Sequence, residues 1–253
     1  MKFTEYISTH QVFTTSSLME SMDSPSAAEE QLRLAVRTGK VERVRRGLLV
    51  SNQGRFEGVP VDPSAVVAAL DGDAIASYHS ALELYGVAHN VSFSFQFRSD
   101  TTRRAFTFRG VAYEPVGHVG GVEWRFMRLA GVRTRVTTRE QTIIDCLDRP
   151  SRSGGVEEVV RSLTTLSYVD LEKLVTLACR RSPATVSRVG WLLSQKTEDW
   201  SVSEEQLARL ESMLGDGPYR LGRPHAGDSC WCRRWRLMFP ADSEEIATWI
   251  THA

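Results

Sequence analysis

The sequence lacks any long apolar run. No stretch approaches the roughly 20 apolar residues of a membrane-spanning helix, and the opening MKFTEYISTH lacks the apolar core of an export signal. Formal net charge is zero, with 31 basic and 31 acidic residues. We therefore expect a cytoplasmic protein without a membrane partner, in which only the local placement of charge can indicate a binding surface.

Cysteine is also scarce, with four in 253 residues: Cys146, Cys179, Cys230 and Cys232. Without an export signal, they predict thiols rather than a disulfide framework. Cys230-Trp-Cys232 lies near His225 and Asp228, but one residue between the cysteines is too tight for a structural zinc grip, and no second cysteine pair follows. We expect no metal site there.

Motifs for catalysis are missing as well. The chain has no P-loop, G-x-G-x-x-G, H-E-x-x-H or G-x-S-x-G, so we expect no cofactor, no catalytic residue and no enzymatic activity. Asp145 and Asp148 flank Cys146 in the spacing of a paired-carboxylate nuclease site, but no suitably spaced lysine accompanies them. We interpret these two carboxylates as solvated side chains at the end of a helix, and His79 as a structural histidine on a helix.

What the sequence does contain begins with a small helical module at residues 1–55. Apolar spacing predicts short helices near residues 2–10 and 15–22, and Pro25 opens a third helix that runs to Gly39. KVERVRRGLLV, residues 40–50, follows as a hairpin that turns at Arg46-Gly47. Val41 and Val44 are three apart, which predicts a bulge. Three helices and a hairpin form the plan of a winged helix-turn-helix DNA-binding domain.

Basic residues concentrate in this module. Residues 33–55 hold one acid, Glu42, and seven cations, a local charge of +6: Arg33, Arg37, Lys40, Arg43, Arg45, Arg46 and Arg55. Phosphates favour such a surface because each neutralised phosphate releases counterions. The predicted DNA contacts are the wing arginines 43, 45 and 46, supported at the helix end by residues 33, 37 and 40, with Ser24 and Ser26 at the helix start.

Two observations weigh against this interpretation. Arginines on a hairpin also serve as a solubilising edge that blocks strand pairing. Glu29 and Glu30 suit a helix N-terminus but would repel phosphates if they faced the DNA backbone.

The pattern of residues 60–253 predicts a larger domain that contains both helices and strands. A linker at 51–62 leads to helices from Pro63 to Leu70 and over residues 75–85, and the alternating VSFSFQFR, residues 91–98, predicts a strand. We expect a small antiparallel sheet within residues 88–137, a helical part at 138–215 opened by a Thr137/Glu140 capping box, and a tail at 216–253. The predicted fold class is α+β.

A second basic group lies on the expected sheet: Arg98, Arg103, Arg104 and Arg109, interleaved with phenylalanines. Arginines among aromatic residues suit a second nucleic-acid surface. They equally suit the wet face of a sheet whose other face buries the phenylalanines, which alternation alone predicts. We favour the latter interpretation.

Taken together, FTTSSLMES…GKVERVRRGLLV, IASYHSALELYGV and VTTREQTIIDCLDRPSRSGGVEEVVRSL resemble the AbiEi-type antitoxins of type IV toxin–antitoxin systems. The most specific matching positions are Thr137, Glu140, Thr142, Asp145, Asp148, Arg149, Pro150, Gly154 and Gly155. The resemblance implies an autorepressor that binds its operon's double-stranded promoter DNA. It also implies a nucleotidyltransferase-like toxin as functional partner, counteracted without a stable complex.

The third helix departs from this family, because SPSAAEEQLRLAV is more acidic than such a DNA-reading helix is expected to be. Two other classes stay open. One is a nuclease or nucleotide-processing enzyme with a winged-helix targeting head, and the other is a solitary, ligand-responsive transcription factor.

Overall fold

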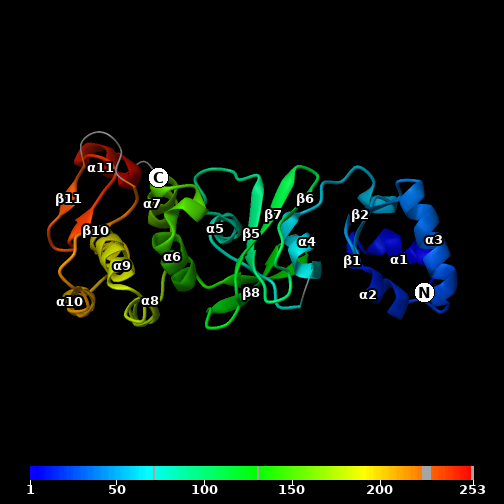
Figure 1. The fold of residues 1–253 in the computed structure, drawn as a ribbon, viewed down its shortest axis with the longest axis horizontal. Coiled ribbons are helices and arrows are strands. Elements are labelled where there is room, and N and C mark those ends of the chain that lie inside the picture. Colours follow the sequence, from blue (N-terminus) through cyan, green and yellow to red (C-terminus); the bar gives the residue numbers. More distant parts are fainter. Residues whose placement is uncertain (71, 130, 224–228, 252–253) are drawn as a thin grey trace. The chain divides into compact units, whose positions relative to one another are not determined.

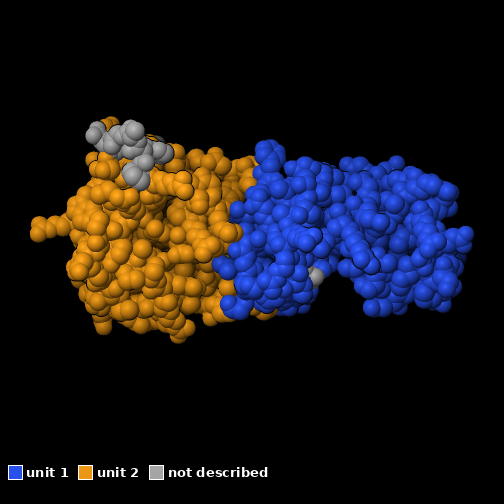
Figure 2. Space-filling view, viewed as in Figure 1, with its two compact units in different colours: residues 1–76, 93–120, 126–135 blue, residues 77–92, 121–125, 136–253 orange. Residues whose placement is uncertain are grey.

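A computed structural model describes residues 1–253 except 71, 130, 224–228 and 252–253. Helices and small sheets alternate along the chain, which confirms the α+β class (Figure 1). The chain divides into two compact units, coloured separately in Figure 2. Unit 1 comprises residues 1–76, 93–120 and 126–135, and unit 2 comprises residues 77–92, 121–125 and 136–253.

Unit 1 begins with a winged helix, which we call the head. Its elements in chain order are α1 (Phe3–Thr9), β1 (Val12–Thr14), α2 (Thr15–Glu20), α3 (Pro25–Arg37), β2 (Val41–Arg45) and β3 (Leu48–Ser51). The strands form an antiparallel sheet in the order β1-β3-β2. Strand β1 was not predicted, because its three residues are too few to show a period-two pattern.

Local chemistry fixes the limits of the head's elements. The Thr14 hydroxyl accepts a hydrogen bond from the Ser17 backbone N–H at 3.0 Å and caps α2. Pro25 occupies the first turn of α3. Gly47 turns the wing with φ +81°, a conformation that favours glycine. The predicted bulge is present between Arg43 and Arg45, and it turns both Val41 and Val44 into the core.

The rest of unit 1 contains most of a six-stranded sheet. Two strands of this sheet, β8 and β9, each have residues in both units. The elements are η1 (Gly54–Phe56), α4 (Pro63–Leu70), β4 (Ile75–Ala76), β5 (Ser94–Arg98), β6 (Phe106–Phe108), β7 (Val111–Gly117), β8 (Trp124–Leu129) and β9 (Val132–Thr137). The strand order is β6-β7-β5-β4-β9-β8. Strands β5 and β7 pair in parallel, so the sheet is mixed, whereas we expected an antiparallel one.

Two sequence predictions fail at the start of this sheet. The strand expected over residues 91–98 begins only at Ser94, and Val91 and Phe93 are 85% and 80% exposed. Alternation continues through Val91, but the pairing of β5 with β4 and β7 covers only Ser94–Arg98. Ile75 and Ala76, expected to open a helix, instead pair with β5 as the short strand β4.

Unit 2 is mainly helical. Its elements are α5 (His79–Tyr85), α6 (Arg139–Asp148), η2 (Pro150–Ser153), α7 (Val156–Thr164), α8 (Leu171–Ala178), α9 (Pro183–Gln195), α10 (Glu204–Glu211), β10 (Tyr219–Arg220), β11 (Trp231–Cys232), β12 (Leu237–Met238) and α11 (Ser243–Thr251). One apolar core joins these helices to the small sheet. Helix α9 lies so close to that sheet that a Cβ on Gly190 would meet the Trp235 ring at 2.1 Å.

Helix α6 begins one residue later than expected. Its N-cap is Thr138, whose hydroxyl accepts from the Gln141 backbone N–H, rather than Thr137 with Glu140. The Thr137 hydroxyl pairs instead with that of Thr142 at 2.7 Å, so two adjacent threonines divide capping and buried bonding between them. No helix in the described ranges has the length and apolarity to cross a membrane.

Candidate nucleic-acid interface

Helix α3 presents a polar row to solvent. Its apolar stripe, Ala28, Leu32 and Ala35, is buried in the head's core. The 3.6-residue period then turns the opposite side outward, and Ser26, Glu30, Arg33 and Arg37 are all exposed there, as expected. Ser24 is exposed at the N-cap, and its side chain makes no capping hydrogen bond. This row is the face that a winged helix turns toward a major groove.

Four cations at the end of α3 and on the wing are uncommitted. The side chains of Arg37, Lys40, Arg43 and Arg46 are exposed and make no ion pair with another described residue. Arg33 differs, because its guanidinium donates to the Glu29 carboxylate at 2.7 Å, one turn earlier on α3. In that pair the guanidinium compensates the negative charge of Glu29, one of the two glutamates that weigh against phosphate binding.

Arg45 is held by its own unit. Its guanidinium donates to the Thr102 hydroxyl at 3.3 Å and lies 5.4 Å from the centroid of the Phe106 ring. The side chain is half-buried, unlike those of Arg43 and Arg46 on the same wing. The structure therefore divides the three predicted wing contacts into two uncommitted arginines and one that packs against the β5–β6 segment.

Glu42, the acid of the wing, is neutralised within unit 1. Arg109 donates to both of its carboxylate oxygens, through Nε at 3.1 Å and through Nη2. The hydrogen bond that Arg109 donates to Glu42 raises the pKa of the Arg109 guanidinium. The wing thus keeps its cations while its one carboxylate is compensated by a residue 67 positions later in the chain.

The second basic group is mostly engaged in local bonds. Arg103 donates through Nε to the Asp100 carbonyl at 3.0 Å and lies beside His118, which pairs with the Asp100 carboxylate at 3.0 Å. Arg98 donates to the His118 carbonyl at 3.5 Å. Only Arg104, among the described members of this group, has an exposed side chain without an ion pair or hydrogen bond. These four arginines do not form a shared cationic surface comparable to the wing.

The other candidates for chemistry do not converge. Asp145 is buried and accepts from the Gln141 side chain at 2.9 Å, whereas Asp148 accepts from the Thr185 hydroxyl at 2.7 Å. Cys230 and Cys232 are half-buried free thiols, and burial raises the pKa of Cys230. Their candidate companions His225 and Asp228 lie outside the described residues. Within the part of the chain that is described, no three side chains gather as metal ligands.

Sequence reasoning missed a buried network in unit 2. Glu158 is 2% exposed and accepts hydrogen bonds from the Ser162 hydroxyl and from the backbone N–H groups of His89 and Asn90, while His79 Nε2 lies 3.1 Å from it. Burial alone would raise the pKa of Glu158, but these bonds and the nearby imidazole outweigh it and hold the pKa below its usual value. His79 and Glu158 lie 79 positions apart in separate segments, so spacing could not reveal that they form a pair.

The head and its cationic edge define a winged-helix protein of the α+β class. No family model matches the chain, and no curated protein does. Among solved structures, the chain is similar to the crystal structure of the RV2827C protein from Mycobacterium tuberculosis, with a TM-score of 0.67 and 15% sequence identity. The match covers 94% of this chain and 89% of that one. At this identity the likeness shows the fold alone.

Proposed function

We propose that the protein binds double-stranded promoter DNA and represses its own operon. The observation that carries this proposal is the cluster of uncommitted cations on the head: Arg37 and Lys40 at the end of α3, and Arg43 and Arg46 on the wing. Helix α3 would enter the major groove while the wing lies along the phosphates. The compensation of Glu42 by Arg109 supports the same role, because it removes a carboxylate that would repel phosphate.

Affinity in this proposal comes mainly from phosphate contacts, and sequence selection comes from the outward row of α3. Ser26 and Glu30 are exposed there, and a glutamate accepts hydrogen bonds from cytosine N4. Because Glu29 is paired with Arg33, the outward row would present Ser26, Glu30 and Arg37 to the DNA. The acidic character of α3 then serves base selection, while the wing supplies charge.

The antitoxin part of the proposal rests on the resemblance to AbiEi-type proteins. The expected antitoxin domain, residues 60–253, would counteract a nucleotidyltransferase-like toxin without forming a stable complex with it. Coexpression with such a toxin, encoded beside this gene, tests that part: rescue of growth is expected from the full chain. Failure of rescue would leave a DNA-binding regulator alone.

The DNA-binding part is tested by replacing Arg43 and Arg46 with alanine and titrating promoter DNA over a range of salt concentrations. Loss of two phosphate contacts should lower the slope of log affinity against log salt by about 1.8, and weaken binding to all sequences alike. The matched control is Arg220→Ala/Arg223→Ala, which removes two exposed cations of unit 2.

Arg45→Ala gives an internal comparison. Arg45 donates a hydrogen bond to Thr102 and packs on Phe106. Its replacement should therefore change the slope of log affinity against log salt by less than half of the change expected for each of Arg43 and Arg46. An unchanged slope in Arg43→Ala/Arg46→Ala, or an equal change in the unit 2 control, contradicts the assignment of the wing to phosphate binding.

A further inference from the structure

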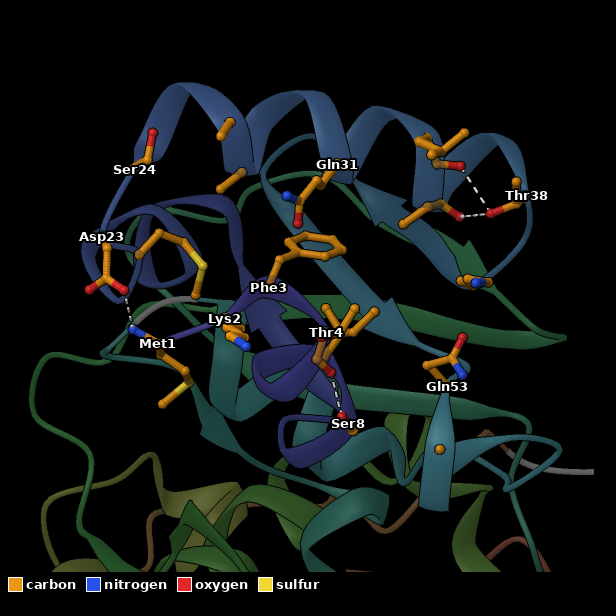
Figure 3. Close-up of a pocket in the computed structure, with 18 residues that line it drawn as sticks. Met1, Lys2, Phe3, Thr4, Ser8, Asp23, Ser24, Gln31, Thr38 and Gln53 are labelled. Carbon is orange, nitrogen blue, oxygen red and sulfur yellow. Dashed lines mark hydrogen bonds and ion pairs between the residues drawn. The ribbon is translucent and has the colours of Figure 1, made fainter.

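The head contains a pocket of about 780 Å³ along the side of α3 that faces α1 (Figure 3). In Figure 3, Phe3 of α1 and Gln31 of α3 face each other across it, and Ser24 and Thr38 mark its two ends along α3. The pocket exists because α3 turns small side chains, Ala27 and Ala28, toward α1. Its volume lies within the range typical of small-molecule sites, about 300–1,000 Å³.

The lining is apolar with a few polar groups. Phe3, Ile7 and Ala35 contribute buried apolar surface, and Leu34 is 50% exposed along one wall. An apolar ligand that covers this exposed leucine is stabilised by about 25 cal/mol for each Å² of apolar surface removed from water. The amides of Gln31 and Gln53 supply polar contacts. This composition, mainly apolar with few polar groups, is typical of sites that hold a small organic molecule.

The charges of the lining residues indicate which class of small molecule the pocket would bind. Asp23 is the one acid among the lining residues, and the α-amino group of Met1 pairs with it at 3.1 Å. Lys2 and Lys40 also line the pocket, and neither makes an ion pair with a described residue. Since Met1 and Asp23 cancel, the lining carries two uncompensated positive charges and no uncompensated negative one.

We propose that this pocket binds an anionic amphiphile: a small molecule with an apolar body and a carboxylate. Lys2 precedes α1 beside Met1, and Lys40 follows the C-terminal end of α3, so the two lysines line the pocket from different parts of the head. From Ala27 to Thr38, the C-cap of α3, the groove follows twelve residues, and the eleven rises between them span about 16 Å. An acyl chain lying along α3 would cover Leu34 and bring its carboxylate to a lysine at one end.

Such a ligand would contact α3 directly beside the row that faces DNA. If the proposed DNA binding is correct, ligand and promoter affinity are coupled, and the coupling is reciprocal. Ligand binding itself does not depend on the proposed function, and the two are measured separately.

The test uses the full chain and decanoate as probe, titrated by calorimetry below the concentration at which decanoate forms micelles. We expect saturable binding of one decanoate per chain. Decyltrimethylammonium, with an equal alkyl chain and the opposite charge, should bind about tenfold more weakly, because two exposed lysines attract one probe and repel the other. Equal affinity for the two probes, or no saturable binding of decanoate, overturns the proposal.

Two variants locate the site. Ala27→Trp places a large side chain in the hollow from an exposed helix position and should abolish decanoate binding, whereas Glu20→Trp, exposed on α2 and outside the lining, should not. Lys2→Gln/Lys40→Gln should weaken decanoate about fivefold and leave decyltrimethylammonium no weaker than before. Because both lysines are exposed, this variant should fold even if Ala27→Trp does not. Decanoate affinity unchanged by the lysine variant refutes the role of the charges.

Sedimentation velocity tests whether a second copy of the chain, rather than a small molecule, occupies the groove. A dimer that Ala27→Trp dissociates, without decanoate binding to the wild type, would assign the groove to a second copy of the chain and overturn the proposal. Promoter titrations with and without decanoate then distinguish the two proposals. Decanoate binding without any promoter binding sinks the DNA proposal alone, and promoter binding without decanoate binding sinks the ligand proposal alone.

Discussion

Replacement of Glu158 by glutamine should destabilise unit 2 by about 3 kcal/mol. One carboxylate oxygen, Oε2, receives the Asn90 backbone N–H at 3.0 Å and the Asn90 side-chain amide at 2.6 Å, while Oε1 receives His89 and Ser162. A glutamine NH₂ group in place of Oε2 faces the two Asn90 donors, and in place of Oε1 it faces the backbone N–H groups of His89 and Asn90, so at least two buried hydrogen bonds are lost. At about 1.5 kcal/mol for each bond to a charged acceptor, the sum is about 3 kcal/mol.

Urea unfolding followed by tryptophan fluorescence measures this difference. The matched control is Glu157→Gln, the preceding residue, whose exposed carboxylate pairs with Arg161 one turn later and should cost less than about 0.5 kcal/mol. Similar costs for the two variants would refute the view that the Glu158 network holds residues 89–90 against α7.

The difference in stability between the wild type and Glu158→Gln should depend on pH, because the pKa of Glu158 is lowered in the folded protein. A carboxyl whose pKa is lower in the folded state stabilises the fold above its unfolded pKa, about 4.3, and loses that contribution as pH falls through the folded pKa. The wild type should therefore lose its advantage over Glu158→Gln as the solution is acidified below about pH 4. An advantage that grows on acidification would contradict the sign of the shift.

Two further predictions concern close contacts of the fold. Gly190→Ala should destabilise the protein by about 1–3 kcal/mol in urea, because the new methyl overlaps the buried Trp235 ring, while Gly120→Ala, in open space, should not; equal midpoints would refute the overlap. Arg109→Ala should weaken promoter binding by leaving Glu42 uncompensated, and adding Glu42→Gln should restore it; a double variant as weak as Arg109→Ala would show that the charge of Glu42 is not the cause.

Sequence patterns located the head well, for identifiable reasons. Proline and glycine carry backbone constraints, so Pro25 and Gly47 fixed the start of α3 and the turn of the wing. The uneven spacing of Val41 and Val44 predicted the bulge, since two buried residues three apart cannot lie on one face of a regular strand. These features depend on neighbours in sequence.

The failures depend on neighbours in space. Ile75 fits a helical period with Tyr78 and Leu82, but pairing with β5 makes it a strand. Likewise, Arg43, Arg45 and Arg46 are equivalent in the sequence, and only the position of Thr102 and Phe106 separates Arg45 from the other two. Pairing across 57 or 67 residues leaves no periodic trace in either segment, so spacing cannot predict which cations of a basic stretch are free.

The Glu42–Arg109 pair has a practical consequence for dissection of the protein. A fragment ending at residue 55, where the sequence places the end of the DNA-binding module, would contain Glu42 and Arg45 but neither Arg109 nor Phe106. Its wing would carry a bare carboxylate and a loose arginine, so the fragment is a poor surrogate for the intact head. Fragments meant to isolate the head should also retain residues 93–120 of unit 1, which supply Phe106 and Arg109.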